Sequence, residues 1–272
     1  MRTQSDLARR FRSLHTPGSP LVLPNAWDTA SALIIAEAGA AAVATTSAGV
    51  AWSLGAPDGD RVDRTEALAQ VARIAVAVPD LPVSADIEGG FEEADGGVAG
   101  TVREVLAAGA VGINIEDGPR PPAEHARRVA VARETADAVG VPLFVNARID
   151  VFLAGIGPEA GRLDETLKRA AACVAAGADG VFVPGVTDAG TVAALVRGID
   201  APLNVLTGPG APATAEFARL GVARISAGSS LVRAVHGLVR DAARELLTEG
   251  TCVSLEGGYD YARINALLES VR

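Results

Sequence analysis

The sequence contains few cysteines, few aromatic residues and no long apolar run. Its two cysteines, Cys173 and Cys252, lie far apart without the spacing of a metal site, which favours a reducing compartment without disulfides and gives no sign of a catalytic thiol. No segment is apolar over enough residues to span a membrane, and the N-terminus lacks the apolar core of a secretory signal. These absences predict a cytoplasmic protein with no membrane partner.

The motifs of several common enzyme classes are also missing. The sequence has no P-loop, no dinucleotide-binding fingerprint, no paired cysteines and no nucleophile elbow. The histidines His15, His125 and His236 all fall in predicted helices or in a leading loop, away from the ends of strands. We therefore interpret them as ordinary helix or surface residues.

An excess of basic charge is absent as well. The 24 Lys and Arg residues against 33 Asp and Glu residues give a net charge of −9, which argues against a nucleic-acid partner because phosphate binding needs a basic face. An acidic chain can still bind a small anion, because a metal ion and an arginine dominate the field inside a small cleft.

The length and the pattern of apolar segments predict one large α/β barrel. Hydrophobic residues make up 49% of the 272 residues, and much of that share is alanine and valine, which suits helices packed tightly over buried strands. A (β/α)8 barrel of the TIM type has about 250 residues. Strands are predicted at 21–24, 41–47, 81–86, 111–116, 142–148, 179–184, 202–206 and 223–227. Helices are predicted at 28–39, 63–78, 95–108, 122–139, 163–176, 188–197, 213–220 and 229–247, after a short N-terminal helix.

Regular alternation of these elements favours a closed barrel over a doubly wound open sheet, which seldom needs so many equal units. We expect residues 1–250 to form the barrel with its short N-terminal helix, and residues 251–272 to form a helical tail. The tail carries an apolar face of Ile264, Leu267, Leu268 and Val271 that needs a partner, such as another subunit. Between the second strand and the next helix, residues 48–60 are expected to form a glycine-rich loop.

Two stretches end in acid where a strand meets its loop. In V-S-A-D-I-E-G-G-F, Asp86 and Glu88 are two residues apart and would share one face of the strand, and V-G-I-N-I-E-D ends in Glu116 and Asp117. Carboxylates that converge at neighbouring strand ends need a positive partner, and hard oxygen ligands favour Mg²⁺, with Mn²⁺ as an alternative. Each acid could instead be a helix cap or a surface ion pair, and for Asp117 a cap is as good an interpretation as a ligand.

An arginine and a small-residue turn could bind the substrate at the same barrel face. Arg148 follows F-V-N-A, which contains Asn146, and its guanidinium offers two parallel donors to a carboxylate or phosphate. A salt bridge to nearby acids is the structural alternative. Ser47 and the backbone N–H groups of Ala48 and Gly49 could form a small anion nest, although a plain tight turn explains the same residues.

Several motifs together make the chain resemble the isocitrate lyase/phosphoenolpyruvate mutase superfamily. The matching segments, in chain order, are L-P-N-A-W-D, T-S-A-G-V-A-W, P-D-G-D, S-A-D-I-E-G-G-F, I-N-I-E-D, V-N-A-R-I-D and G-A-D-G-V-F-V-P. The resemblance implies a barrel whose C-terminal helix is exchanged between subunits, in a homotetramer built as a dimer of dimers or in a homodimer. It also implies a 2-oxo acid, or its enolate, bound to Mg²⁺ that carboxylates hold partly through water.

The resemblance also implies roles for individual residues. By position, Asp86, Glu88 and Glu116 become the metal set, and Asp58 becomes an additional acid of the metal shell. The catalytic set is Arg148, Asp58 and Glu116. The substrate-binding set is Ser47, Ala48, Gly49, Asn146 and Arg148.

The departures from the superfamily pattern restrict the expected chemistry. Glu116 is followed by D-G-P-R-P-P, which lacks both the cysteine loop of the lyases and the longer gating loop of the mutases. Pro184 and Gly185 stand where the mutases have a histidine and a serine. These differences argue against cysteine-assisted cleavage and against phosphonate rearrangement.

The expected activity is therefore a Mg²⁺-dependent carbon–carbon lyase, or decarboxylase, acting on a small 2-oxo dicarboxylate such as oxaloacetate. The metal would act as an electron sink for the enolate that remains when a bond at C3 breaks. The alternatives are a hydrolase or mutase acting on phosphonopyruvate or oxaloacetate, a (methyl)isocitrate-type lyase, and a barrel that binds a 2-oxo acid without turnover.

Overall fold

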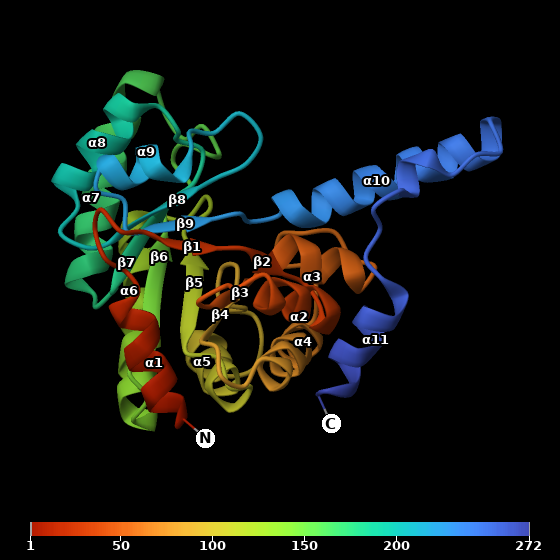
Figure 1. The fold of residues 1–272 in the computed structure, drawn as a ribbon. Helices are drawn as coiled ribbons and strands as arrows, with labels where there is room; N and C mark the ends of the chain where they lie inside the picture. Colours follow the sequence, from red (N-terminus) through yellow and green to blue (C-terminus); the bar gives the residue numbers. More distant parts are fainter. Residues whose placement is uncertain (1, 272) are drawn as a thin grey trace.

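Nine parallel strands wind into one barrel in the computed structural model, which describes residues 2–271 (Figure 1). Neighbouring strands pair in the order β1-β9-β8-β7-β6-β5-β4-β3-β2. The strands are β1 (Leu21–Leu23), β2 (Asn25–Ala26), β3 (Val43–Thr45), β4 (Val83–Asp86), β5 (Gly112–Glu116), β6 (Phe144–Arg148), β7 (Gly180–Val183), β8 (Leu203–Leu206) and β9 (Arg224–Ser226). The predicted α/β barrel is confirmed.

The barrel closes through one segment that pairs on both sides. β1 pairs with β9, and β2, which follows it after Pro24, pairs with β3. The single strand predicted at 21–24 is thus two short strands, because proline has no N–H to donate to a neighbouring strand and interrupts the pairing.

Helices follow the strands as the alternation predicts, with one addition. The helices are α1 (Gln4–Ser13), α2 (Thr29–Glu37), α3 (Ser47–Ser53), α4 (Arg64–Ala77), α5 (Gly97–Ala107), α6 (Pro122–Val139), α7 (Arg162–Ala175), α8 (Ala189–Gly198), α9 (Thr214–Arg219), α10 (Ser230–Thr248) and α11 (Tyr261–Glu269). The loop prediction for 48–60 is wrong over its first half, where α3 forms directly after β3. Ser47, predicted at the end of a strand, is the first residue of that helix.

The N-terminal helix closes the bottom of the barrel. Thr3 caps α1 through a reciprocal pair of hydrogen bonds with Asp6, which satisfies free N–H groups of the first turn. On the inner side of the helix, Phe11 is fully buried and packs with Phe144, the first residue of β6. This apolar plug leaves the opposite end of the barrel, where the strands end, as the accessible mouth.

The last predicted barrel helix does not cover the barrel. Figure 1 shows α10 extending away from the strands, and Val232 is its only buried residue. Apolar side chains along α10 are exposed to solvent: Leu231, Val235, Leu238, Val239, Leu246 and Leu247. In a single subunit, the helix predicted at 229–247 therefore leaves the strands of its own barrel uncovered (Figure 1).

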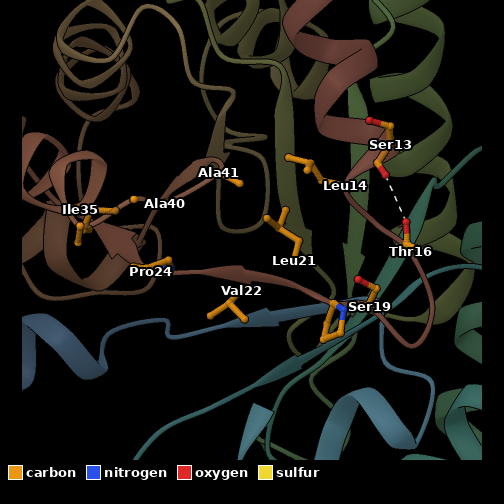
Figure 2. A pocket seen from close by; sticks show the side chains of 13 residues that line it. Ser13, Leu14, Thr16, Ser19, Leu21, Val22, Pro24, Ile35, Ala40 and Ala41 are labelled. Carbon is orange, nitrogen blue, oxygen red and sulfur yellow. Dashed lines mark hydrogen bonds between the residues drawn. The ribbon is translucent and has the colours of Figure 1, made fainter. Parts of the chain in front are cut away.

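A groove of about 510 Å³ lies on the outer side of the barrel beside β1. Figure 2 shows Leu14 on one flank and Ile35 and Ala40 on the other, with Leu21 and Val22 between them. Val22 is 44% exposed, as expected for a strand face that no helix covers. The helix after the last strand of a (β/α)8 barrel ordinarily packs outside the strands, and here that helix is α10.

The tail folds back onto the chain. Helix α11 contacts α2, where Leu267 and Val271 pack against the core and Arg263 forms an ion pair with Glu37. Part of the predicted apolar face thus has a partner within the same chain, while Leu268 is still 39% exposed. Met1 and Arg272, the outer ends of the two predicted ranges, lie outside the described residues. Within residues 2–271, no helix combines the length and apolarity needed to cross a membrane.

Candidate active site at the mouth of the barrel

A cavity of about 240 Å³ opens where the strands end. The predicted site residues Ser47, Ala48, Asp58, Asp86 and Arg148 all line it. The larger groove beside β1 has no charged side chain in its lining. Because active sites of such barrels lie at the carboxyl ends of the strands, the smaller cavity is the candidate site.

Asp86 is the last residue of β4 and the most buried of the acids that face the cavity. Its Oδ2 accepts a hydrogen bond from the Ser47 N–H at 3.3 Å, and its own N–H donates to Thr45 Oγ1 at 2.9 Å. Its Oδ1 is buried without a partner. Burial raises the pKa of Asp86, the Arg148 guanidinium lowers it, and the Asp58 carboxylate raises it further.

Glu88 lies just beyond the strand rather than on it. β4 ends at Asp86, and Glu88 has a φ of 50°, a left-handed conformation that is uncommon outside glycine. The argument from strand alternation therefore does not apply, although both acids still border the same small recess. The Glu88 carboxylate accepts a hydrogen bond from the Asp60 N–H, and burial raises its pKa to about 7.

Glu116 and Arg148 form an ion pair between adjacent strands. They stand opposite each other in β5 and β6, with Arg148 Nη1 2.7 Å from Glu116 Oε2. Burial raises the pKa of Glu116 to about 8, although the Arg148 cation acts in the opposite direction. Arg148 also donates through Nε to Asp150 Oδ1 at 2.7 Å. The salt-bridge alternative is thus present, and the guanidinium still lines the cavity.

The predicted anion nest is the first turn of α3. Ser47 and Ala48 line the cavity, whereas Gly49 packs against Trp27 and is not part of the lining. N–H groups in the first turn of a helix have no partner within the helix, so they are free to bind an anion. The Ser47 N–H is already directed at Asp86.

Two other predicted residues have supporting positions. Asp117 is fully buried and accepts hydrogen bonds from the Asp150 N–H and from Arg169, which makes it a structural anchor for the loop after β5. Asn146 is 1% exposed and donates through Nδ2 to Asn114 Oδ1 at 2.9 Å. The structure thus places Asn146 beneath the cavity lining.

Sequence reasoning missed several polar residues of the cavity. These residues are Asn25, Thr46, Asn114, Ser226, Ser229 and Arg233. Asn114 stands two residues before Glu116 on β5, so the alternation argument used for the acids could have found it. Arg233 lies on α10, whose direction is not encoded in a local pattern.

The donors at this mouth fit a hard cation that keeps part of its water shell. Within residues 2–271, no three His, Cys, Asp or Glu side chains are placed to hold a metal ion by themselves. Asp86 Oδ1 is buried without a hydrogen-bond partner, and burial raises the pKa values of Asp86 and Glu88, so a nearby cation would stabilise both carboxylates. Mg²⁺ is usually bound through one or two carboxylates plus water and substrate oxygens, which this donor set can supply.

Comparison with known proteins identifies the family. The family model "Phosphoenolpyruvate phosphomutase" matches residues 11–247. The chain belongs to this family, within the phosphoenolpyruvate mutase/isocitrate lyase superfamily. The resemblance stated from the motifs is confirmed.

The relatives differ in what is known of them. An uncharacterised Mycobacterium tuberculosis protein is 40% identical over 224 residues, covering 80% of this chain and 81% of the relative. An oxaloacetate decarboxylase of Pseudomonas syringae pv. tomato is 32% identical over 231 residues, covering 81% and 78%. The crystal structure of a proposed lyase/mutase from Burkholderia cenocepacia J2315 has a TM-score of 0.88 and 39% identity, covering 97% of this chain and 96% of that one. These matches support an enzyme of the lyase and mutase type.

Proposed function

We propose that this chain is a Mg²⁺-dependent carbon–carbon lyase that decarboxylates a small 2-oxo dicarboxylate of the oxaloacetate type. The observation that carries the proposal is the lining of the cavity, with the acids Asp58 and Asp86 together with the arginines Arg148 and Arg233. Such a lining suits an anion with two carboxylates bound beside a cation. The similarity to an oxaloacetate decarboxylase supports the same substrate class.

The chain's own residues would bind and orient the substrate. Arg148 is held by Glu116 and Asp150, so its remaining donors have a fixed direction toward a substrate carboxylate. The first-turn N–H group of Ala48, which lines the cavity, would donate to an oxygen of the same group. Asp86, with support from Glu88 and Glu116, would hold Mg²⁺, which supplies Lewis-acid stabilisation of developing negative charge.

The cavity lining favours decarboxylation over the other cleavages. Among the described residues, no cysteine, histidine, lysine or tyrosine lines the cavity. Retro-aldol or retro-Claisen cleavage needs a positioned base, and cysteine-assisted cleavage needs a thiol at the site. Cys173 is buried, and burial raises its pKa to about 12. Loss of CO₂ needs only the electron sink and a later proton, which water can deliver.

The test is a mass-spectrometric screen of 2-oxo and 2-hydroxy di- and tricarboxylates with Mg²⁺, comparing the native protein with Asp86→Ala. We expect conversion of oxaloacetate to pyruvate that EDTA abolishes and that falls at least about 100-fold in the variant, because the metal loses a direct carboxylate ligand. Asp80→Ala, at an exposed acid before β4, is the matched control and should keep native activity.

Other products would select the alternatives. Oxalate and acetate from oxaloacetate would indicate a hydrolase, and glyoxylate from a tricarboxylate would indicate an isocitrate-type lyase. Conversion of phosphonopyruvate would indicate a mutase or a phosphonate hydrolase. Metal-dependent binding of a 2-oxo acid without any turnover would indicate a binding barrel and contradict the enzymatic proposal.

A further inference from the structure

An arginine without a carboxylate partner lies inside the barrel, below the cavity. Arg224, on β9, is fully buried and is the largest fully buried side chain of the described residues. Its Nε donates to Ser226 Oγ at 3.0 Å and its Nη2 donates to Asn114 Oδ1 at 3.2 Å, while Nη1 has no partner. The Asp86 carboxylate and the ring of Phe11, 5.9 Å from Arg224 Cζ, compensate part of the charge, but no carboxylate pairs with it directly, and a buried charge without a direct ion pair is costly. The position therefore calls for a functional explanation.

The guanidinium determines which way the Asn114 amide points. An arginine can only donate, so the Asn114 atom that faces it must be the carbonyl oxygen. The same oxygen accepts a second hydrogen bond, from Asn146 Nδ2 at 2.9 Å. With both lone pairs of Oδ1 used, the Nδ2 amide group is left for the cavity, which Asn114 lines.

The Ser226 hydroxyl belongs to the same hydrogen-bond network as Arg224 and Asn114. Ser226 Oγ accepts from Arg224 and donates its proton to Asn204 Oδ1 at 3.2 Å. Ser226 therefore has no proton left to donate into the cavity. Asn114 stands opposite Asp86 in the pairing of β4 with β5, and both residues line the cavity.

We infer that Asn114 donates its amide to a carboxylate or oxo oxygen of the bound anion, and that Arg224 is a positioning residue that holds the amide in this orientation. The inference rests on the proposed function for the identity of the anion. It adds a neutral donor in the cavity floor to the arginines Arg148 and Arg233. Arg224 reaches the substrate only through Asn114.

The test uses oxalate as a binding probe, titrated calorimetrically into the native protein with Mg²⁺, beside the KM for oxaloacetate. Asn114→Asp keeps an oxygen that accepts from Arg224 and Asn146 and removes the donor, but it adds a negative charge, so the uncharged Asn114→Leu is titrated beside it and must also weaken binding. We expect Asn114→Asp to raise the Kd for oxalate and the KM about 10- to 100-fold, as for loss of a hydrogen bond to a charged group. Asn204→Ser removes another buried amide next to Ser226, and it should lower the melting temperature with less than about a twofold change in Kd.

The positioning role has its own readout. Arg224→Met should raise the Kd in the native background but add nothing in an Asn114→Ala background, because residues that act through one contact are not additive. Arg224→Lys keeps a donor for Asn114 Oδ1 and should recover part of the loss. If Arg224→Met fails to fold, Asn114→Asp and Arg224→Lys still decide the question.

The outcomes separate the inference from the proposed function. Turnover of oxaloacetate with an unchanged KM and Kd in Asn114→Asp would overturn the inference and leave the function standing. Weakened oxalate binding in Asn114→Asp, combined with no turnover by the native protein, would support the inference and contradict the proposed function. Equal effects of Arg224→Met in both backgrounds would overturn the positioning role, and a native protein that neither binds oxalate nor turns over oxaloacetate would overturn both.

Discussion

Arg233 brings a charged side chain to the cavity from the helix after the last strand, α10. It lies in the first turns of α10 and borders both the cavity and a shallow outer pocket formed with Trp52 and His236. If it binds the second carboxylate of the substrate, its loss should weaken binding more than chemistry. The residue thus distinguishes recognition of a dicarboxylate from recognition of a monocarboxylate.

We expect Arg233→Gln to raise the KM for oxaloacetate about tenfold or more while kcat changes by less than about threefold, because one charge-assisted hydrogen bond is lost. Steady-state kinetics measure both constants. Arg240→Gln, on the same helix but outside the cavity lining, is the control. A fall in kcat with an unchanged KM would show that Arg233 serves the chemical step instead.

The buried ring of His15 should make the free energy of unfolding depend on pH, separately from any effect on catalysis. The ring stacks on Phe144 with centroids 3.9 Å apart, and its Nδ1 bonds the Phe11 carbonyl at 2.8 Å. Burial, together with the nearby Arg224 cation, lowers the pKa of His15 to about 3. Between pH 6.5 and 3 the unfolded chain binds a proton that the folded chain does not, so stability falls as the pH falls through this window.

His15→Asn keeps a donor for the Phe11 carbonyl and removes the titration. The native protein should lose about 1.4 kcal/mol more than the variant between pH 7.5 and 5.5. Urea denaturation at both pH values measures this difference. Glu88 and Glu116 have raised pKa values that act in the opposite direction, and they cancel in the comparison. An equal loss of stability in the native protein and in His15→Asn between the two pH values would contradict the lowered pKa of His15.

At the scale of elements, the position of α3 depends on close contact with the segment before α2. A Cβ placed on Gly49 would lie 2.7 Å from Trp27 Cβ and 2.8 Å from Thr46 Cγ2, closer than real Cβ contacts. The helix could not keep its position with a larger residue there. Its first turn carries Ser47 and Ala48 to the cavity, so packing on the outer side of α3 determines the geometry on the inner side.

Gly49→Ala should therefore destabilise the fold by about 1–3 kcal/mol, as overpacking does, and lower kcat/KM about tenfold or more. Thermal melts and steady-state kinetics measure the two effects. Gly237→Ala in α10 is the matched control, because nothing lies within 4 Å of the added Cβ and the exchange should stabilise the helix by up to about 1 kcal/mol. Native activity in Gly49→Ala would show that α3 can shift without cost.

At the scale of the molecule, α10 and the groove beside β1 are complementary features that a single subunit leaves apart. The helix exposes apolar side chains, and the groove exposes an uncovered strand. The expectation from the superfamily, an exchange of the C-terminal helix between subunits, would bury both. Covering apolar surface is the dominant favourable term in association.

We expect the native protein to be a dimer or tetramer in solution and Leu238→Arg to shift it toward the monomer, because a charge would be buried against the neighbouring subunit. Light scattering after gel filtration measures the mass. Val76→Arg replaces another exposed apolar residue, 63% exposed on α4, and should leave the mass unchanged. A monomeric native protein would contradict the exchange.

The sequence by itself determined the barrel and the positions of most acids of the candidate site, because both follow from short-range patterns of residues. Apolar runs of strand length alternate with helical periods, and acids stand at the points where strands end. Asp86, Glu116 and Arg148 follow directly from this pattern, since parallel strands bring their carboxyl ends together. The superfamily motifs are equally local.

Only the tertiary structure decided how distant segments meet. The helical start of the loop after β3, the direction of α10 and the arrival of Arg233 depend on packing between residues far apart in the chain. Asn114 shows the reason most clearly, because its amide is oriented by Arg224, 110 residues further along the chain. A local pattern marks a side chain as polar and near a strand end, whereas the direction of its donor depends on which group occupies the interior beside it.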